Sequence, residues 1–132
     1  MATVGARKLV IVVDDELGVL KGIEHLLKAR GFDCELFSSV KDFQNRASLQ
    51  LAVCLVLDIN LNGESGIDVR RKLTATWPSL PVIFITGNDS DAARKAAIEA
   101  GCIAYLTKPF SANSLLDAIE KAFARPPLPL QR

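Results

Sequence analysis

The sequence predicts one α/β domain, a doubly wound five-stranded parallel sheet flanked by five helices. Its 132 residues are enough for a single domain with a core and too few for two. Five short apolar runs alternate with five segments of helical period, which is the pattern of parallel strands joined by crossover helices. Four of these runs end in polar side chains, and open α/β sheets bind their ligands at such strand ends.

The first predicted strand is the β-branched run Leu9–Val13, which ends directly in the acids DDE at 14–16. Residues 17–30 then change to helical period, with apolar side chains on one stripe and charged ones on the other. Gly31 follows as a natural helix stop. The only histidine, His25, falls on the polar stripe, so we predict no catalytic role for it.

The second strand is predicted at Asp33–Phe37, where polar and apolar side chains alternate as in an edge strand. Ser38 or Ser39 caps a short helix that runs to about Ala47. The longest apolar run, Leu51–Leu57, predicts a third strand that is buried on both faces.

Asp58 follows this buried run, and turn-forming residues follow Asp58 up to Gly66. A buried strand that ends in one acid presents that acid at the carboxyl edge of the sheet. The alternative is that Asp58 only caps the following loop. The ends of the other strands decide between the two interpretations.

A third helix is predicted to begin near Ser65 or Gly66 and to end before Pro78, which cannot continue it. The run Val82–Ile85 then predicts a fourth strand, and this strand ends in the hydroxyl group of Thr86.

The fourth helix is rich in alanine, is capped by Asp89 or Ser90 and ends at Gly101. The fifth strand, Ile103–Leu106, leads into Lys108. This strand therefore brings an ammonium group to the same edge.

Ser111 caps an amphipathic last helix. Residues 125–132 are dense in proline and cannot continue it. We therefore divide the chain into a domain at 1–124 and a short extended tail at 125–132.

Composition restricts the class of function. Sixteen Lys and Arg against fifteen Asp and Glu leave a net charge of +1, so nothing indicates a nucleic acid or an anionic membrane as partner. No apolar run reaches the roughly 20 residues that span a bilayer, and the first residues lack the apolar segment of a signal peptide. We expect a cytoplasmic protein. The three cysteines show no metal-ligand spacing and imply no disulfide framework.

The strand ends supply groups that suit a metal ion and an anion. The carboxyl ends of parallel strands lie on one side, so we expect Asp14, Asp15, Asp58, Thr86 and Lys108 to converge. Three ionised carboxylates repel one another, and a bound divalent cation relieves that repulsion. Oxygen ligands suit Mg²⁺, while the lysine and the threonine are placed to meet an anion.

Four segments, in order, strongly resemble the receiver domain of two-component response regulators: VVDDE at 12–16, LVLDINLNGESG at 55–66, VIFITG at 82–87 and YLTKPF at 105–110. The resemblance covers roughly residues 8–124 and implies the strand order 2-1-3-4-5. It implies that Asp58 accepts a phosphoryl group from a sensor histidine kinase or a phosphotransfer protein. Such a chain is a phosphoacceptor that assists its own phosphorylation and dephosphorylation rather than an enzyme.

The same resemblance implies a Mg²⁺ site made of Asp14, Asp15, Asp58 and the backbone carbonyl of Asn60. Asp15 is the better candidate for direct coordination, and Asp14 for binding through water.

The resemblance also implies that Lys108 pairs with the phosphoryl oxygens and that the Thr86 hydroxyl bonds one of them after transfer. Tyr105 is then either the switch aromatic, which moves inward when Thr86 shifts, or a half-buried packing residue. Pro109 is expected to follow a cis peptide bond that orients Lys108.

One departure from the family pattern is Leu61-Asn62, where receivers usually have Met-Pro. We expect a looser loop after Asp58 and a different turn at Asn62-Gly63, with phosphorylation competence retained. The alternative function, a receiver-like interaction module that no longer uses phosphorylation, gains slightly from this departure.

Two other α/β classes fit less well. A phosphatase of the haloacid dehalogenase type expects an Asp-x-Asp pair and a cap insertion, and neither is present. A flavodoxin-like flavin module expects a phosphate loop rich in Ser, Thr and Gly where this chain has the acids at 14–16, which would repel phosphate.

The resemblance places the output face on the fourth helix, the fifth strand and the fifth helix. This face would control a downstream protein or an output domain that the chain lacks, and it would also suit a phosphorylation-dependent homodimer. Two alternatives stay open: a stand-alone receiver, or a fragment of a larger regulator.

Overall fold

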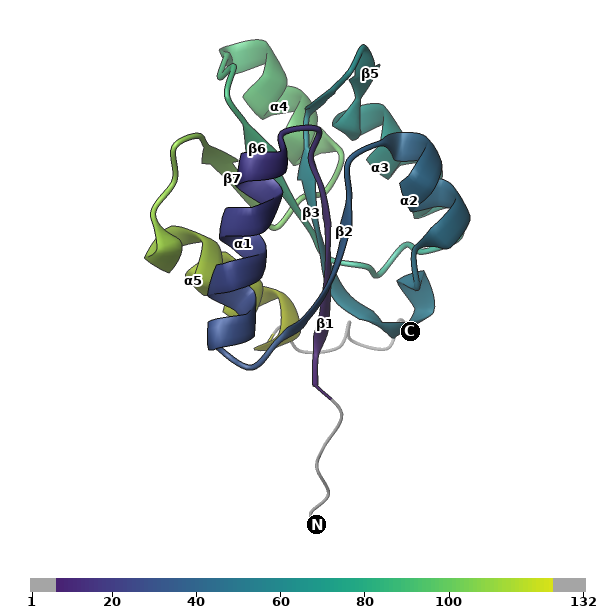
Figure 1. The fold of residues 1–132 in the computed structure, drawn as a ribbon. Helices are drawn as coiled ribbons and strands as arrows, with labels where there is room; N and C mark the ends of the chain where they lie inside the picture. The colour runs from purple at the N-terminus through teal and green to yellow at the C-terminus, as the bar shows by residue number, and fades with distance from the viewer. Residues whose placement is uncertain (1–6, 125–132) are drawn as a thin grey trace.

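The computed structural model describes residues 7–124 (Figure 1). The proline-rich tail predicted at 125–132 lies outside the described residues. The helices are α1 (Leu17–Ala29), α2 (Val40–Arg46), α3 (Gly66–Thr74), α4 (Asp91–Glu99) and α5 (Ala112–Ala124). The strands are β1 (Leu9–Val13), β2 (Asp33–Phe37), β3 (Ala52–Asp58), β4 (Asn60–Leu61), β5 (Glu64–Ser65), β6 (Val82–Thr86) and β7 (Ala104–Thr107). None of the described helices has the length and apolar character needed to cross a membrane.

The main sheet has five parallel strands in the order β2-β1-β3-β6-β7. This confirms the predicted order 2-1-3-4-5, because β6 and β7 are the fourth and fifth strands of this sheet in chain order. The alternating segment Asp33–Phe37 is the edge strand β2, as its pattern predicts. The β-branched and aliphatic side chains of β1, β3 and β6 are almost all fully buried, which drives these strands to the centre.

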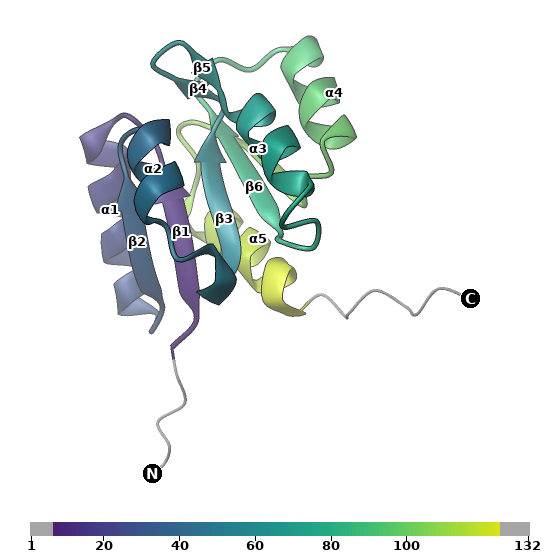
Figure 2. The same cartoon turned by 90° about the vertical axis from the view of Figure 1, so that its right-hand side faces the viewer.

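Helices cover both faces of the sheet, α1 and α5 on one side and α2, α3 and α4 on the other (Figures 1 and 2). Alternate residues of each strand point to opposite faces, so Val10 and Val12 join the first core while Ile11 and Val13 join the second. The two cores lie on opposite faces of the sheet, and its carboxyl edge is left for loops.

Serine hydroxyls begin four of the helices. The Oγ atoms accept backbone N–H groups at 3.0–3.2 Å: Ser39 from Asp42, Ser65 from Ile67, Ser90 from Ala93 and Ser111 from Ser114. For α2, α3 and α4 this selects one residue from each pair that the sequence left open.

Two predicted boundaries are wrong. Leu51 is not part of the buried strand: it is 66% exposed and ends a short 3-10 helix, Leu49–Leu51, in which its N–H donates to the carbonyl of Ser48 at 3.0 Å. Apolar character alone does not distinguish this turn from the strand that follows it. The third helix ends at Thr74 rather than just before Pro78, and Trp77 is a half-buried packing residue.

The loop after Asp58 is a β-hairpin, with the different turn at Asn62-Gly63 that the sequence predicts. Asn60–Leu61 pairs antiparallel with Glu64–Ser65, and the two residues between them have positive φ angles, +47° at Asn62 and +87° at Gly63. Positive φ at both central positions is what a type I′ hairpin turn requires, and Asn-Gly is a favoured pair for it. A proline at position 62 could not adopt this conformation.

Candidate functional site

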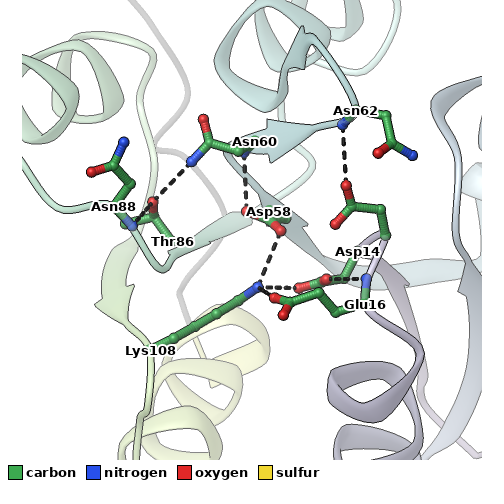
Figure 3. Close-up of polar contacts among 9 residues, drawn as sticks. Asp14, Glu16, Asp58, Asn60, Asn62, Thr86, Asn88 and Lys108 are labelled. Atoms are coloured by element: carbon green, nitrogen blue, oxygen red, sulfur yellow. Dashed lines mark hydrogen bonds and ion pairs between the residues drawn. The ribbon is translucent and has the colours of Figure 1, made fainter.

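The carboxyl edge of the sheet brings together the side chains that follow four of its strands (Figure 3). Asp14 follows β1, Asp58 ends β3, Thr86 ends β6 and Lys108 follows β7. Asp14, Asp58 and Thr86 are almost completely buried, at 0%, 3% and 0% exposure. Burial of polar groups is unfavourable unless they are paired, so their partners define the site.

The ammonium group of Lys108 lies at the centre of three carboxylates (Figure 3). Its Nζ is 2.8 Å from Asp14 Oδ2, 2.6 Å from Glu16 Oε1 and 3.1 Å from Asp58 Oδ2. The lysine side chain is 14% exposed, so water screens these ion pairs only partly. The peptide bond between Lys108 and Pro109 is cis.

Backbone amides hold the remaining carboxylate oxygens of the two buried acids. The N–H of Asn60 donates to Asp58 Oδ1 at 3.0 Å, and the N–H of Glu16 donates to Asp14 Oδ1 at 2.8 Å. Each amide follows its acid by two residues, so the turn after each strand fixes the carboxylate.

Opposing effects act on the pKa of Asp58, and on balance it is raised. Burial raises the pKa of Asp58, and nearby Asp14 raises it further, whereas the Asn60 amide and Lys108 lower it. Burial lowers the pKa of Lys108, but its hydrogen bonds to Asp14, Glu16 and Asp58 together raise it. The lysine therefore stays protonated at neutral pH.

Gly66 allows α3 to begin directly against this acid. A Cβ atom at Gly66 would collide with the carbonyl oxygen of Asp58. The N–H of Gly66 donates to the carbonyl of Ile59 at 2.7 Å, which holds the two segments in contact. The backbone that carries Asp58 is thus packed on one side by a residue that must lack a side chain.

The donor set fits a hard divalent cation. Asp14, Glu16 and Asp58 each offer a carboxylate oxygen within 4.8 Å of the others. Asp14 Oδ2 is buried, and the Lys108 ammonium lies 2.8 Å from it. Ligands made only of oxygen suit Mg²⁺, which takes one or two carboxylates and keeps several waters.

The structure places the predicted metal ligands in two different settings. Asp14 and Asp58 belong to the group of three acids, whereas Asp15 turns toward the hairpin and accepts the N–H of Asn62 at 3.1 Å. Glu16 takes a place in this group that the sequence did not assign to it. The signal was its position next to Asp14 and Asp15, but only the contact with Lys108, 92 residues away, shows that its carboxylate reaches the group.

Thr86 is held beside Asp58 by the neighbouring loops. Its Oγ1 accepts the N–H of Asn88 at 3.0 Å and the side-chain amide of Asn60 at 3.4 Å. Asn60 thus contacts both Asp58, through its backbone, and Thr86, through its side chain (Figure 3).

Tyr105 lies on β7, is half-buried and packs against the core under α4. Its hydroxyl group donates to Asp89 in the loop that follows β6. Asp89 comes three residues after Thr86, so one loop contacts both side chains that were predicted to switch.

The sequence and the fold both match those of known proteins. A family model described as the response regulator receiver domain matches residues 10–120. The response regulator protein TmoT of Ectopseudomonas mendocina is 36% identical over 92% of this chain and 55% of its own length. TodT of Pseudomonas putida, also a response regulator protein, is 34% identical over 90% of this chain and 52% of its own length. The chain therefore spans about half the length of these relatives.

Solved structures agree with the sequence matches. The response regulator StyR is 38% identical with a TM-score of 0.81, over 90% of this chain and 60% of that one. The BeF3-activated receiver domain of DrrB is 29% identical with a TM-score of 0.82, over 91% of this chain and 100% of that one. Sequence, fold and the acidic edge lead to one conclusion: the chain belongs to the response regulator receiver domain family of two-component signalling.

Proposed function

We propose that this receiver domain accepts a phosphoryl group on Asp58 and uses it to change the surface formed by α4, β7 and α5. The observation that carries the proposal is the setting of Asp58, whose buried carboxylate lies 3.1 Å from the Lys108 ammonium within a group of three acids. A nucleophilic carboxylate beside a fixed cation and a set of metal ligands is what phosphoryl transfer to an acid needs.

In the proposed transfer, an Asp58 oxygen bonds to phosphorus while the bond from phosphorus to the donor histidine nitrogen breaks. The electron pair of the broken bond stays on that nitrogen. Lys108 then exchanges a carboxylate contact for one with a phosphoryl oxygen, and its positive charge stabilises the charge on the transferring group. The Thr86 hydroxyl, whose Oγ1 accepts the Asn88 N–H in this structure, then donates a hydrogen bond to another phosphoryl oxygen.

Asp14 and Asp58 would hold Mg²⁺, with Glu16 or Asp15 as the further acid. When bound, the ion would supply positive charge near the phosphoryl oxygens. The backbone carbonyl of Asn60 stays a proposed ligand. Asn60 is placed for this role by its own N–H bond to Asp58.

The donor would be a sensor histidine kinase or a phosphotransfer protein in the cytoplasm. Because the related response regulators are about twice as long, the switched surface would act on an output domain elsewhere in a longer protein, on a separate target, or on a second copy of this domain. The alternative of a phosphorylation-independent module has less support, since the acids, the lysine and the threonine are all retained at one edge.

Intact mass after incubation with acetyl phosphate tests the proposal. We expect one phosphoryl adduct that depends on Mg²⁺ and is absent in Asp58→Asn. Asp68→Asn removes an exposed carboxylate on α3 that pairs with Arg71, and it is the matched control, which should keep the adduct. An adduct that persists in Asp58→Asn would refute Asp58 as the acceptor.

A further inference from the structure

Tyr105 is held in its present position by two residues outside the phosphorylation site. Its hydroxyl donates to Asp89 Oδ1 at 2.9 Å, and this contact is exposed to solvent. Asp89 lies in the loop between β6 and α4, and Tyr105 lies on the neighbouring strand β7. The hydroxyl therefore points to the loop just before α4. It does not point toward Thr86, which is fully buried.

Arg94 completes a closed set of contacts. Its Nη2 lies 3.0 Å from Asp89 Oδ2, and its guanidinium carbon lies 4.7 Å from the centre of the Tyr105 ring. Each oxygen of Asp89 thus has its own donor, and the tyrosine ring has a cation over its face. We call Asp89, Arg94 and Tyr105 the tyrosine latch.

The protonation states of Asp89 and Tyr105 favour the hydrogen bond between them. The hydrogen bond from Tyr105 lowers the pKa of Asp89, and the Arg94 contacts lower it too. Partial burial raises the pKa of the Tyr105 hydroxyl, and the Asp89 contact raises it further. At neutral pH the phenol is thus a neutral donor to an ionised carboxylate, which is the stronger kind of hydrogen bond.

The latch is joined by a short chain segment to the residue that is expected to respond to phosphorylation. Asn88, whose N–H donates to Thr86 Oγ1, directly precedes Asp89. A movement of Thr86 toward a phosphoryl group would release this Asn88 bond and shift the loop that carries Asp89. The latch has to open, or to move as a unit, before the ring can turn inward.

We propose that Asp89 and Arg94 are positioning residues that hold the Tyr105 side chain beside the start of α4. In doing so they oppose the change of conformation that accompanies phosphorylation. This inference rests on the proposed function. It assigns a restraining role to a carboxylate and a guanidinium that touch neither the phosphoryl acceptor nor its metal ligands. A ligand that prefers one of two states shifts their populations, and so does the loss of a contact that only one state makes.

The sole tyrosine of the sequence makes the latch directly observable. Labelling with ¹³C-tyrosine gives one Cζ resonance, which reports both the hydrogen bond and the ionisation of the phenol. In Asp89→Ala we expect this resonance to move and the pKa of Tyr105 to fall toward its ordinary value. The control Asp68→Ala breaks an exposed pair of similar length with Arg71, at 3.2 Å, and should leave the resonance unchanged.

Phosphoryl uptake from acetyl phosphate, followed by intact mass, tests the restraining role. We expect Asp89→Ala to take up the group about two- to tenfold faster than wild type, the range that corresponds to one hydrogen bond. In a Tyr105→Phe background the same change should have no further effect, since the hydroxyl is already gone.

Two results would overturn the inference. An unchanged Tyr105 resonance in Asp89→Ala would show that the contact does not hold the tyrosine, and an uptake rate at or below that of wild type would show that the latch does not oppose the switch. If wild type takes up no phosphoryl group at all, the proposed function fails and the restraining role fails with it. The resonance still shows in that case whether Asp89 holds Tyr105, so the two failures are distinguishable.

Discussion

At the scale of single residues, the site depends on one ammonium group shared by three carboxylates. Lys108 lies within 3.1 Å of an oxygen from each of Asp14, Glu16 and Asp58. One positive charge cannot neutralise three negative charges, so the arrangement is unfavourable by itself and favours any further cation. Asp58 contributes to this unfavourable electrostatic energy, because burial and Asp14 both raise its pKa.

The raised pKa of Asp58 predicts a stability effect with a definite sign. A carboxyl group whose pKa is higher in the folded state than in the unfolded state stabilises the fold while it is protonated, and this contribution is lost as the pH rises through the folded-state pKa. We therefore expect Asp58→Asn, which cannot ionise, to have a larger free energy of unfolding than wild type at neutral pH. The difference should shrink as the pH falls.

The measurement is urea unfolding from acidic to neutral pH in the absence of Mg²⁺. The exposed α3 variant Asp68→Asn is the control and should stay within about 0.5 kcal/mol of wild type. A loss of stability in Asp58→Asn at neutral pH would mean that the ion pair with Lys108 outweighs burial, contrary to this account.

At the scale of elements, the β4–β5 hairpin explains how the chain manages without the usual proline. The Asn62-Gly63 pair has the positive φ angles of a tight hairpin turn, and the freed N–H of Asn62 donates to Asp15. The hairpin thus both orders the loop after Asp58 and binds Asp15, the neighbour of Asp14. A proline would supply neither the dihedral angle nor the donor.

Asn62→Pro should therefore destabilise this domain even though it restores the common family residue. We expect a loss of about 1–3 kcal/mol in the free energy of unfolding, because the φ angle of +47° is closed to proline. Asn62→Gly keeps the N–H and tolerates positive φ, so it should remain near wild type in the same urea titration. Equal stability of the proline variant and wild type would mean that the hairpin does not order the loop in solution.

The start of α3 is the second element that fixes the site. A methyl group at Gly66 would collide with the carbonyl oxygen of Asp58, so Gly66→Ala must move either the helix or the acid. We expect a loss of about 2–4 kcal/mol in thermal or urea unfolding, together with slower phosphoryl uptake. Gly22→Ala on α1, where a Cβ meets nothing within 4 Å, is the matched control and should be neutral or slightly stabilising. Similar stabilities of the two variants would contradict the tight contact.

At the scale of the whole molecule, the parallel sheet accounts for what the sequence could predict. Apolar runs locate the strands, and parallel pairing then requires Asp14, Asp58, Thr86 and Lys108 to share one edge. Leu51 was misplaced because an apolar residue in a turn looks like the start of a strand.

The contacts that could not be predicted join residues far apart in the chain through one specific orientation of a side chain. Glu16 meets a lysine 92 residues away, and Asp15 meets an amide 47 residues away. The tyrosine latch likewise depends on how α4 lies against β7. Hydrophobic periodicity contains no information about such orientations.

The central claim is that Asp14, Thr86 and Lys108 act together on a single phosphoryl group attached to Asp58. A crystal structure of this chain with Mg²⁺ and beryllofluoride, which mimics a phosphoryl group, would test it most directly. We expect beryllium on an Asp58 oxygen, one fluorine at Lys108 Nζ, another at Thr86 Oγ1, and the cation held by Asp14 and Asp58. A mimic bound elsewhere, or bound to Asp58 without contacts from Lys108 and Thr86, would contradict the account.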